Sequence, residues 1–337
     1  MYLKSLRKIS WSAGLLIIIL LGLGILSLLG RDTPAMGSGD WFYQLDHGGD
    51  RRSYILHLPP AAAKGKVALI VALHGVTPSI TNFRRQSNLD AEADREGFAV
   101  LYPMGIRSLG LLTWNAGACC GWAQWRGVDD VGFILQAINQ VIEEAPIDPS
   151  QVYLTGLSNG AMMAYRLAAA APERFAAMAA VAGTLHVEPK QDSRPMPILH
   201  IQSVDDPLLP YEGRWTLLGR FPGVEEMLKP WLELDGCPLQ ARIIQRLEQN
   251  SQQYGHSIAI RKAWGPCKEN VQVIAWQLIG PGHVWPGGNP PFYLRWLTHG
   301  PTRIINANTE MWRFFSRYHL PQPTAVDTKA AHVNSAG

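Results

Sequence analysis

The stretch from Val152 to Ala161, V-Y-L-T-G-L-S-N-G-A, decides the fold. Its first four residues predict a buried strand, and the Ala-rich run over 159–171 predicts a helix that ends before Pro172. A serine at such a strand-to-helix turn, with a glycine two positions away on either side, matches G-x-S-x-G. Because the glycines let the backbone pass closely, the turn is expected to lift the Ser158 hydroxyl above the sheet edge. The alternative interpretation is a serine that only caps the helix.

Outward from this turn, apolar runs alternate with amphipathic ones. Further strands are expected at 54–58, 67–73, 98–102, 177–182, 198–202 and 271–278, and further helices at 81–96, 128–144 and 306–318. Strands that alternate with helices predict an α/β fold with a mostly parallel sheet covered on both faces. Residues 211–268 do not continue this alternation, and we expect them to form an insertion packed over one end of the sheet.

The composition excludes several classes of protein. Of the 337 residues, 47% are hydrophobic and 17% are charged, which excludes disorder for most of the chain. The 32 glycines and 24 prolines imply many turns and exclude a helical bundle or a coiled coil. The net charge is only +3, and the positive residues that flank the N-terminal apolar run account for it. Nucleic acid is therefore not an expected partner.

The N-terminal segment predicts export. Residues 10–30 carry no charge and, at about 1.5 Å per residue, are long enough to cross a bilayer. Lys4, Arg7 and Lys8 precede them, so the positive-inside rule leaves residues 1–9 in the cytoplasm and the rest outside. We expect a retained membrane anchor, and a cleaved signal sequence that releases a secreted protein is the alternative. A linker at 31–49, a catalytic domain at 50–319 and a disordered tail at 320–337 would follow.

Four cysteines fit an exported chain, because disulfides persist outside the cytoplasm. They allow three pairings. We favour a bridge between Cys237 and Cys267, which would close a loop of thirty residues, and leave the pairing of the neighbours Cys119 and Cys120 open. No C-x-x-C pair is present, so the sequence predicts no metal site.

A nucleophilic serine needs a base and an orienting acid, expected in the order Ser, Asp, His along the chain. Among the later histidines, only His283 lies just past a predicted strand in a loop rich in Gly and Pro, so we expect it to be the base. The strand at 198–202 is followed by Asp205 and Asp206. Asp206 is the preferred acid, and Asp205 is the alternative that could cap the turn instead.

The substrate oxygen that becomes negative in acyl transfer needs two N–H donors. We expect one from the backbone of Asn159, directly after the serine, and one from Val76, in the loop after Leu73-His74-Gly75. Trp285, two residues from His283, is expected to line the substrate pocket, with simple packing as the alternative. Two neighbouring acidic residues, Asp129 and Asp130, are expected to cap the helix that follows them.

A set of longer motifs then carries a resemblance to a known family. They are L-H-G at 73–75, Y-P-M-G at 102–105, W-N-A-G-A-C-C-G at 114–121, P-E-R-F-A-A at 172–177, D-D-P-L-L-P-Y at 205–211 and G-H-V-W-P-G-G at 282–288. With the serine motif, they make residues 50–318 resemble the polyhydroxybutyrate depolymerase and feruloyl-esterase-like group of exported α/β-hydrolases. Two departures are Val76, where the family often has Cys, and H-I-Q-S-V-D-D at 200–206, where the family commonly has H-G-T-x-D.

The resemblance implies the α/β-hydrolase fold, the roles of Ser158, Asp206 and His283, and the pairing of Cys237 with Cys267. The expected function is that of a serine esterase that works through an acyl-enzyme and needs no cofactor or metal. Poly- or oligo-3-hydroxyalkanoates are the expected ester substrates, and feruloyl or acetyl-xylan esters are the alternative. A peptidase and a non-catalytic binding protein at the cell surface are the remaining hypotheses.

Overall fold

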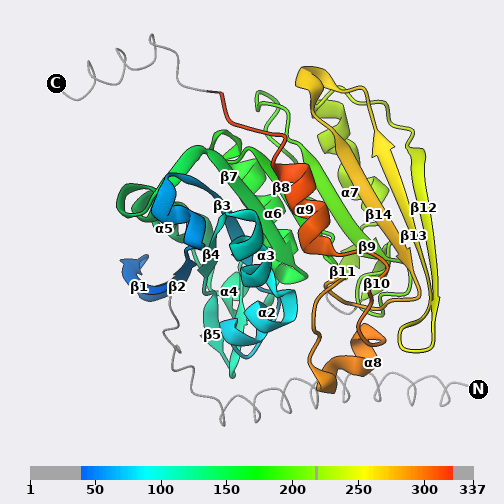
Figure 1. Ribbon diagram of the computed structural model, residues 1–337, viewed down its shortest axis with the longest axis horizontal. Helices are drawn as coiled ribbons and strands as arrows, with labels where there is room; N and C mark the ends of the chain where they lie inside the picture. The colour runs from blue at the N-terminus through cyan, green and yellow to red at the C-terminus, as the bar shows by residue number, and fades with distance from the viewer. Residues whose placement is uncertain (1–38, 217–218, 322–337) are drawn as a thin grey trace, which may run out of the picture.

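The computed structural model describes residues 39–216 and 219–321, which fold around a ten-stranded sheet (Figure 1). Its strands lie in the order β1-β2-β4-β3-β7-β8-β9-β14-β13-β12. The central strands run parallel to one another and are β4 (Ala99–Pro103), β3 (Val67–Leu73), β7 (Ile147–Leu157), β8 (Ala177–Val181), β9 (Ile198–Ser203) and β14 (Val273–Ile279). The mostly parallel sheet expected from the sequence is confirmed.

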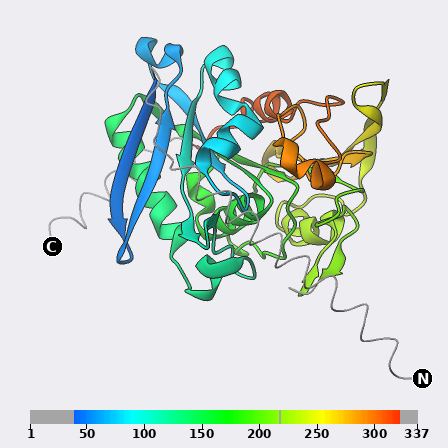
Figure 2. The ribbon, with the colours of Figure 1, turned by 90° about the horizontal axis from the view of Figure 1, so that it is seen from below.

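Antiparallel hairpins extend both edges of this sheet. β1 (Asp40–His47) and β2 (Asp50–His57) lie beside β4, while β13 (Gly255–Trp264) and β12 (Arg242–Ser251) lie beside β14. Figure 2 shows the blue hairpin and the yellow one at opposite ends of the molecule. The pairing register of β12 shifts between Ile243 and Gln245, which marks a β-bulge.

These hairpins change two expectations. Within the segment 31–49, expected to be a linker, Asp40–His47 form a strand. The segment 211–268, expected to be an insertion packed over one end of the sheet, is inserted between β9 and β14 and also lengthens the sheet by two strands through its hairpin. In both cases the strand is at an edge and largely exposed, so its sequence lacks the continuous apolar run that identifies a central strand. The expected disordered tail lies almost wholly outside the described residues.

Helices cover both faces of the sheet, so the core has two layers. One layer holds α5 (Asp130–Glu144), α6 (Asn159–Ala170) and α7 (Val224–Leu234), and the other holds α2 (Ile80–Ser87), α3 (Leu89–Glu96) and α9 (Ala307–Phe315). Strand β3 serves both layers, since Leu69 and Val71 face the first and Ile70 and Ala72 face the second. All of β3 is buried, which explains its unbroken apolar sequence.

The helix expected over 81–96 is in fact two helices. Asn88, with a φ of 52°, ends α2 before α3 begins. Asparagine tolerates this left-handed conformation better than most residues. The Asn308 side chain on α9 donates a hydrogen bond to the Ser87 carbonyl at 2.9 Å, so a distant helix holds the break. A tertiary contact of this kind leaves no mark in the local sequence pattern.

Short elements follow the carboxyl ends of the parallel strands. They are the hairpin of β5 (Ile106–Ser108) and β6 (Leu111–Thr113), the hairpin of β10 (Arg214–Thr216) and β11 (Gly219–Phe221), and the helices α4 (Gly121–Trp125) and α8 (Arg295–Thr298). They gather at the lower end of the view in Figure 1. Loops at this edge of an open α/β sheet are where ligand chemistry is normally placed.

Candidate active site

Ser158 lies between the end of β7 and the start of α6. Its φ of 56° and ψ of −121° lie outside the regions that L-residues commonly occupy. Its side chain makes no capping hydrogen bond to α6, so the simple helix-cap interpretation finds no support. The residue is half-buried, and a strained turn holds it at the N-terminal end of the helix.

Close backbone contacts explain the glycines around this serine. A Cβ at Gly156 would overlap the carbonyl oxygen of Gly160, and a Cβ at Gly160 would overlap that of Leu73. The loop after β3 also touches the turn, because a Cβ at Gly75 would lie 3.2 Å from the Ser158 Cβ. Any larger residue at Gly156 or Gly160 would displace the turn.

His283 and Asp206 meet at the same edge of the sheet. Nδ1 of His283, in the loop after β14, lies 2.7 Å from Oδ2 of Asp206, in the loop after β9. His283 is 7% exposed and Asp206 is 2% exposed. Asp206 also accepts from the N–H groups of Leu208 and Leu209, each at 2.9 Å. With its two oxygens bonded, the carboxylate has a fixed orientation that holds the imidazole.

The neighbouring Asp205 has a different set of contacts. Its Oδ2 accepts a hydrogen bond from the Gly280 N–H at 2.6 Å, which ties the loop after β9 to the start of the loop that carries His283. Of the two aspartates, the structure therefore brings Asp206 to the imidazole and leaves Asp205 as a loop tie. Within residues 39–216 and 219–321, neither Nε2 of His283 nor the Ser158 hydroxyl has a hydrogen-bond partner. Both remain free for a substrate, and such contacts often tighten only when one binds.

Two backbone N–H groups belong to the segments that meet at the serine turn. In the described part of the chain, the N–H groups of Val76 and Asn159 have no acceptor. Asn159 is the first residue of α6, and Val76 follows Gly75, which packs on Ser158. Free N–H groups at a helix start carry a partial positive charge, so the Asn159 N–H favours an anion beside Ser158.

His74 orients the peptide that contains the Val76 N–H. Its Nε2 accepts from the Gly105 N–H at 2.9 Å, so the ring proton lies on Nδ1, which donates to the Gly75 carbonyl at 2.7 Å. Because the peptide is planar and trans, the Val76 N–H points in the direction opposite to the Gly75 carbonyl, away from His74. Burial lowers the pKa of His74 to about 4, which keeps the ring neutral at neutral pH.

A model of the family described as esterase PHB depolymerase matches residues 52–243. The chain belongs to this family. The match confirms the resemblance inferred from the sequence motifs, and the chain is accordingly an esterase, a carboxylic ester hydrolase.

Individual relatives of this esterase agree with the family. NocK of Nocardia uniformis subsp. tsuyamanensis, which is named an esterase, is 31% identical over 72% of the chain and 73% of its own length. The bifunctional acetylxylan esterase/xylanase XynS20E of Neocallimastix patriciarum is 27% identical over 77% of the chain, which spans 35% of that longer protein. The solved acetyl xylan esterase from Aspergillus awamori has a TM-score of 0.54 at 18% identity and covers 82% of the chain and 99% of its own. That likeness confirms the α/β-hydrolase fold.

Trp285 corrects one expectation. Its side chain is fully buried rather than lining a pocket. The indole Nε1 donates to Oδ1 of Asn308 at 2.8 Å, and the ring packs edge-on against Phe83 with 5.8 Å between the centroids. Proximity to His283 in sequence was misleading, because the chain turns inward after residue 283 and its next aromatic side chain joins the core.

Several residues that support the site were missed in the sequence. Gln202 on β9 donates to Oδ2 of Asp206 at 3.2 Å, and behind it His200 Nε2 lies 3.3 Å from the Gln202 Oε1. Polar residues at alternate positions of a buried strand were the available signal, since such residues need partners. Asp130 was expected to cap α5, but only Asp129 does so, and Asp130 forms a buried ion pair with Arg52 at 2.6 Å.

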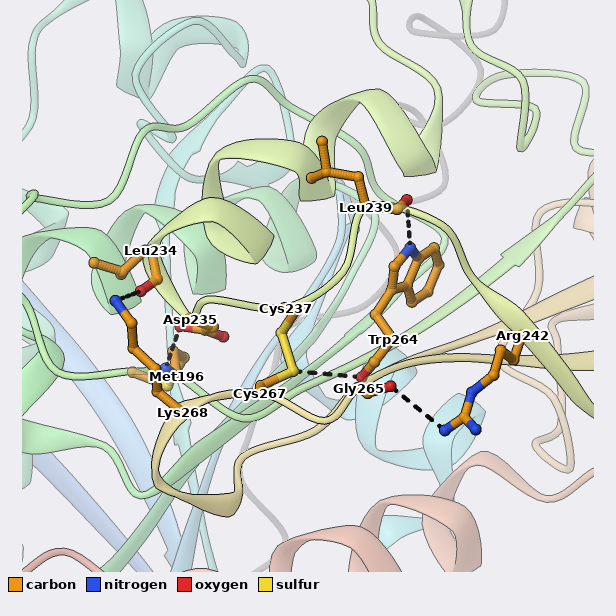
Figure 3. Close-up of a disulfide and its surroundings, with 10 residues drawn as sticks. All are labelled: Met196, Leu234, Asp235, Cys237, Leu239, Arg242, Trp264, Gly265, Cys267 and Lys268. Atoms are coloured by element: carbon orange, nitrogen blue, oxygen red, sulfur yellow. Dashed lines mark hydrogen bonds between the residues drawn. A yellow bond between two sulfur atoms is a disulfide. The ribbon is translucent and has the colours of Figure 1, made fainter.

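Two disulfides occur in this esterase. Cys237, after α7, is bonded to Cys267, after β13 (Figure 3), and Cys119 is bonded to Cys120. Disulfides are typical of proteins that fold in an oxidising compartment, so they indicate an extracytoplasmic protein. Among the described residues, no helix is long and apolar enough to span a membrane, and no cluster of His, Cys, Asp or Glu could hold a metal ion. The expected anchor at 10–30 lies outside these residues.

Proposed function

We propose that this esterase hydrolyses carboxylic esters with Ser158 as nucleophile, His283 as base and Asp206 as the orienting acid. The observation that carries the proposal is the 2.7 Å bond between Asp206 and His283 at the sheet edge where β7 ends in the strained Ser158 turn. Strands β7, β8, β9 and β14 are parallel neighbours, so the loops that follow them share this edge.

In the first half of the reaction, the Ser158 Oγ attacks the ester carbonyl carbon and gives its proton to Nε2 of His283. Asp206 keeps the other ring proton on Nδ1 and stabilises the imidazolium that forms. The tetrahedral intermediate then collapses, the C–O bond to the alcohol breaks, and the alcohol leaves with the proton from Nε2. In the second half, water repeats these steps on the acyl-enzyme, releasing the acid and restoring Ser158.

The N–H groups of Val76 and Asn159 would stabilise the negative oxygen of both tetrahedral intermediates. Each such donor is worth roughly 3 kcal/mol of transition-state stabilisation in other serine hydrolases. Both donors belong to the main chain, so the reaction depends on where the backbone lies more than on which side chain stands at position 76.

For the substrate, we propose an ester of a 3-hydroxyalkanoate oligomer or polymer, in agreement with the family description. An acetyl-xylan or feruloyl ester is the second candidate, and the similarity to the acetylxylan esterase/xylanase of Neocallimastix patriciarum favours it. Hydrolysis measured side by side on 3-hydroxybutyrate oligomers, acetylated xylan and methyl ferulate distinguishes the candidates.

We further propose that residues 10–30 anchor the esterase in a membrane with its catalytic domain outside. The support is the uncharged apolar run preceded by Lys4, Arg7 and Lys8, together with the disulfides. Mass spectrometry of the mature N-terminus tests this proposal. A chain that begins after residue 30 would show instead that the segment is a cleaved signal and the esterase is secreted.

Ser158→Ala tests the reaction itself. We expect the variant to lose turnover of a short p-nitrophenyl ester by at least about 10⁴-fold and to lose labelling by a fluorophosphonate probe, with an unchanged melting temperature. If the wild-type protein is not labelled at Ser158 and turns over neither esters nor amides, the protein is a non-catalytic binding protein. Faster cleavage of a matched amide than of the ester would indicate a peptidase.

A further inference from the structure

The candidate oxyanion hole consists of the backbone N–H groups of Val76 and Asn159. Trp114 links these two donors. It lies directly after β6, is fully buried, and makes hydrogen bonds with both its main chain and its indole ring. The proposed mechanism assigns no role to this residue. Its contacts nevertheless lead to both N–H donors.

The first link runs to Asn159. The Asn159 carboxamide accepts from the Trp114 N–H at 2.7 Å and donates to the Trp114 carbonyl at 3.2 Å. Two bonds between one side chain and the main chain of one residue fix the orientation of that side chain. The Asn159 side chain is 1% exposed, so water does not compete for these bonds. Asn159, whose backbone N–H would face the anion, is therefore held in place through its side chain.

The second link runs to Val76 through His74. The Trp114 indole Nε1 donates to the His74 carbonyl at 2.9 Å, and the two rings stack with 4.6 Å between their centroids. His74 in turn bonds the Gly75 carbonyl, which belongs to the same peptide as the Val76 N–H. Next to this peptide, Thr77 and Leu112 exchange backbone hydrogen bonds, so the strand that leads into Trp114 also lies beside the loop.

A buried ion pair anchors the link. The N–H of Asn115 donates to Oδ2 of Asp130 at 2.7 Å, and Asp130 is paired with Arg52 at 2.6 Å. Both charged side chains are almost fully buried. Asp130 is the first residue of α5, so Trp114 is held against a long helix rather than on a free loop.

We propose that Trp114 is a positioning residue that fixes the separation of the Val76 and Asn159 N–H donors. Its indole holds the loop after β3, and its main chain holds the start of α6. The inference rests on the proposed function, since it concerns how the donors of that mechanism are held. Trp114 does not touch the substrate carbonyl and acts only through His74 and Asn159.

Trp114→Phe tests the inference, because it removes the indole N–H and keeps an aromatic ring. For a soluble p-nitrophenyl ester we expect kcat to fall about 10- to 100-fold while KM stays within about threefold. The inhibition constant of a trifluoromethyl ketone, which forms a tetrahedral adduct with the serine, should rise by the same factor as kcat/KM falls.

Trp231→Phe is the matched control. Trp231 is equally buried and donates its indole N–H to a backbone carbonyl, that of Val187 at 3.1 Å. Trp231→Phe should lower the free energy of unfolding about as much as Trp114→Phe does, and should leave kcat and the inhibition constant unchanged. If Trp114→Phe leaves kcat and the inhibition constant within twofold of wild type, the inference is wrong.

Asn159→Ala keeps the test decisive if Trp114→Phe does not fold. It removes both bonds to Trp114 but keeps the backbone N–H, and the same fall in kcat at constant KM is expected. An undiminished kcat in this variant overturns the inference. Retained turnover in Ser158→Ala would overturn the proposed function and this inference together, whereas full activity of Trp114→Phe overturns the inference alone.

Discussion

The two sides of the candidate site are built in opposite ways. On the oxyanion side the proposed working groups belong to the main chain, at Val76 and Asn159, and side chains position them. On the acid–base side the proposed working groups are the side chains of Asp206 and His283, and main-chain groups position them together with the Gln202 side chain. The Leu208 and Leu209 N–H groups hold Asp206, and the His283 N–H donates to the Leu297 carbonyl at 2.8 Å.

This difference predicts which substitutions delete a functional group of the site and which only move one. A change at Asp206 or His283 deletes a reacting or orienting group. A change on the oxyanion side cannot delete the N–H donor of any residue except by proline, so it acts by moving the donor. The acid–base side should therefore show larger losses from single substitutions.

The largest expected effect comes from Asp206→Asn. The amide cannot stabilise the imidazolium and favours the wrong tautomer of His283, so kcat should fall about 10⁴-fold. Asp205→Asn is the matched control, because an amide oxygen can still accept the Gly280 N–H. Steady-state kinetics on a p-nitrophenyl ester compares the two. Equal losses in both variants would contradict the assignment of Asp206 as the acid.

A second prediction separates stability from catalysis. The disulfide between Cys237 and Cys267 spans a sequence separation of 30, and its removal should lower the free energy of unfolding by about 3 kcal/mol. Because the bond lies at the ends of α7 and β13 and touches neither side of the site, the kcat of the folded double variant Cys237→Ser, Cys267→Ser should stay near wild type. Urea denaturation and kinetics at 25 °C measure both quantities. A large loss of kcat in the folded protein would show that this segment helps to position the site.

The smallest effect concerns the buried histidine behind the acid. Burial lowers the pKa of His200 to about 4, below the usual value of 6.5, so the unfolded chain binds a proton that the folded chain excludes. Stability is fully present above pH 6.5 and falls by about 1.4 kcal/mol per pH unit between 6.5 and 4. His200→Gln removes this titration. Between pH 7.5 and pH 5.5, the unfolding free energy of wild type should thus fall by about 1.4 kcal/mol more than that of His200→Gln.

The unfolding free energies of wild type and His200→Gln must be compared at each pH, because a second buried group makes stability change with pH in the opposite direction. Burial raises the pKa of Asp235 to about 7, so this carboxyl favours the folded state more as the pH falls toward 5.5. Asp235 is present in both proteins and its contribution cancels in the difference. A pH-independent difference would mean that His200 has the same pKa in the folded and the unfolded chain, and would contradict the prediction.

The sequence predicted the parts of the site that have a local or topological rule. The G-x-S-x-G turn needs glycines at fixed positions, and loops after parallel strands share one edge, so Ser158, Asp206 and His283 could be named as candidates before any coordinates. The rest depends on contacts between distant segments. Trp285 turns into the core, Asp130 pairs with Arg52, and Asn88 is held by Asn308. None of these contacts follows from spacing, because a partner far along the chain decides each of them.

One of the two edge strands of the sheet, β12, has a consequence for the behaviour of the protein at high concentration. In the described part of the protein, β12 pairs with β13 on one side and with no strand on the other. An open strand of this kind invites the growth of the sheet into a second molecule. Here the bulge near Ile243 interrupts the regular hydrogen-bond ladder, and Arg246 and Glu248 place opposite charges along the exposed strand. Both features discourage aggregation through this edge.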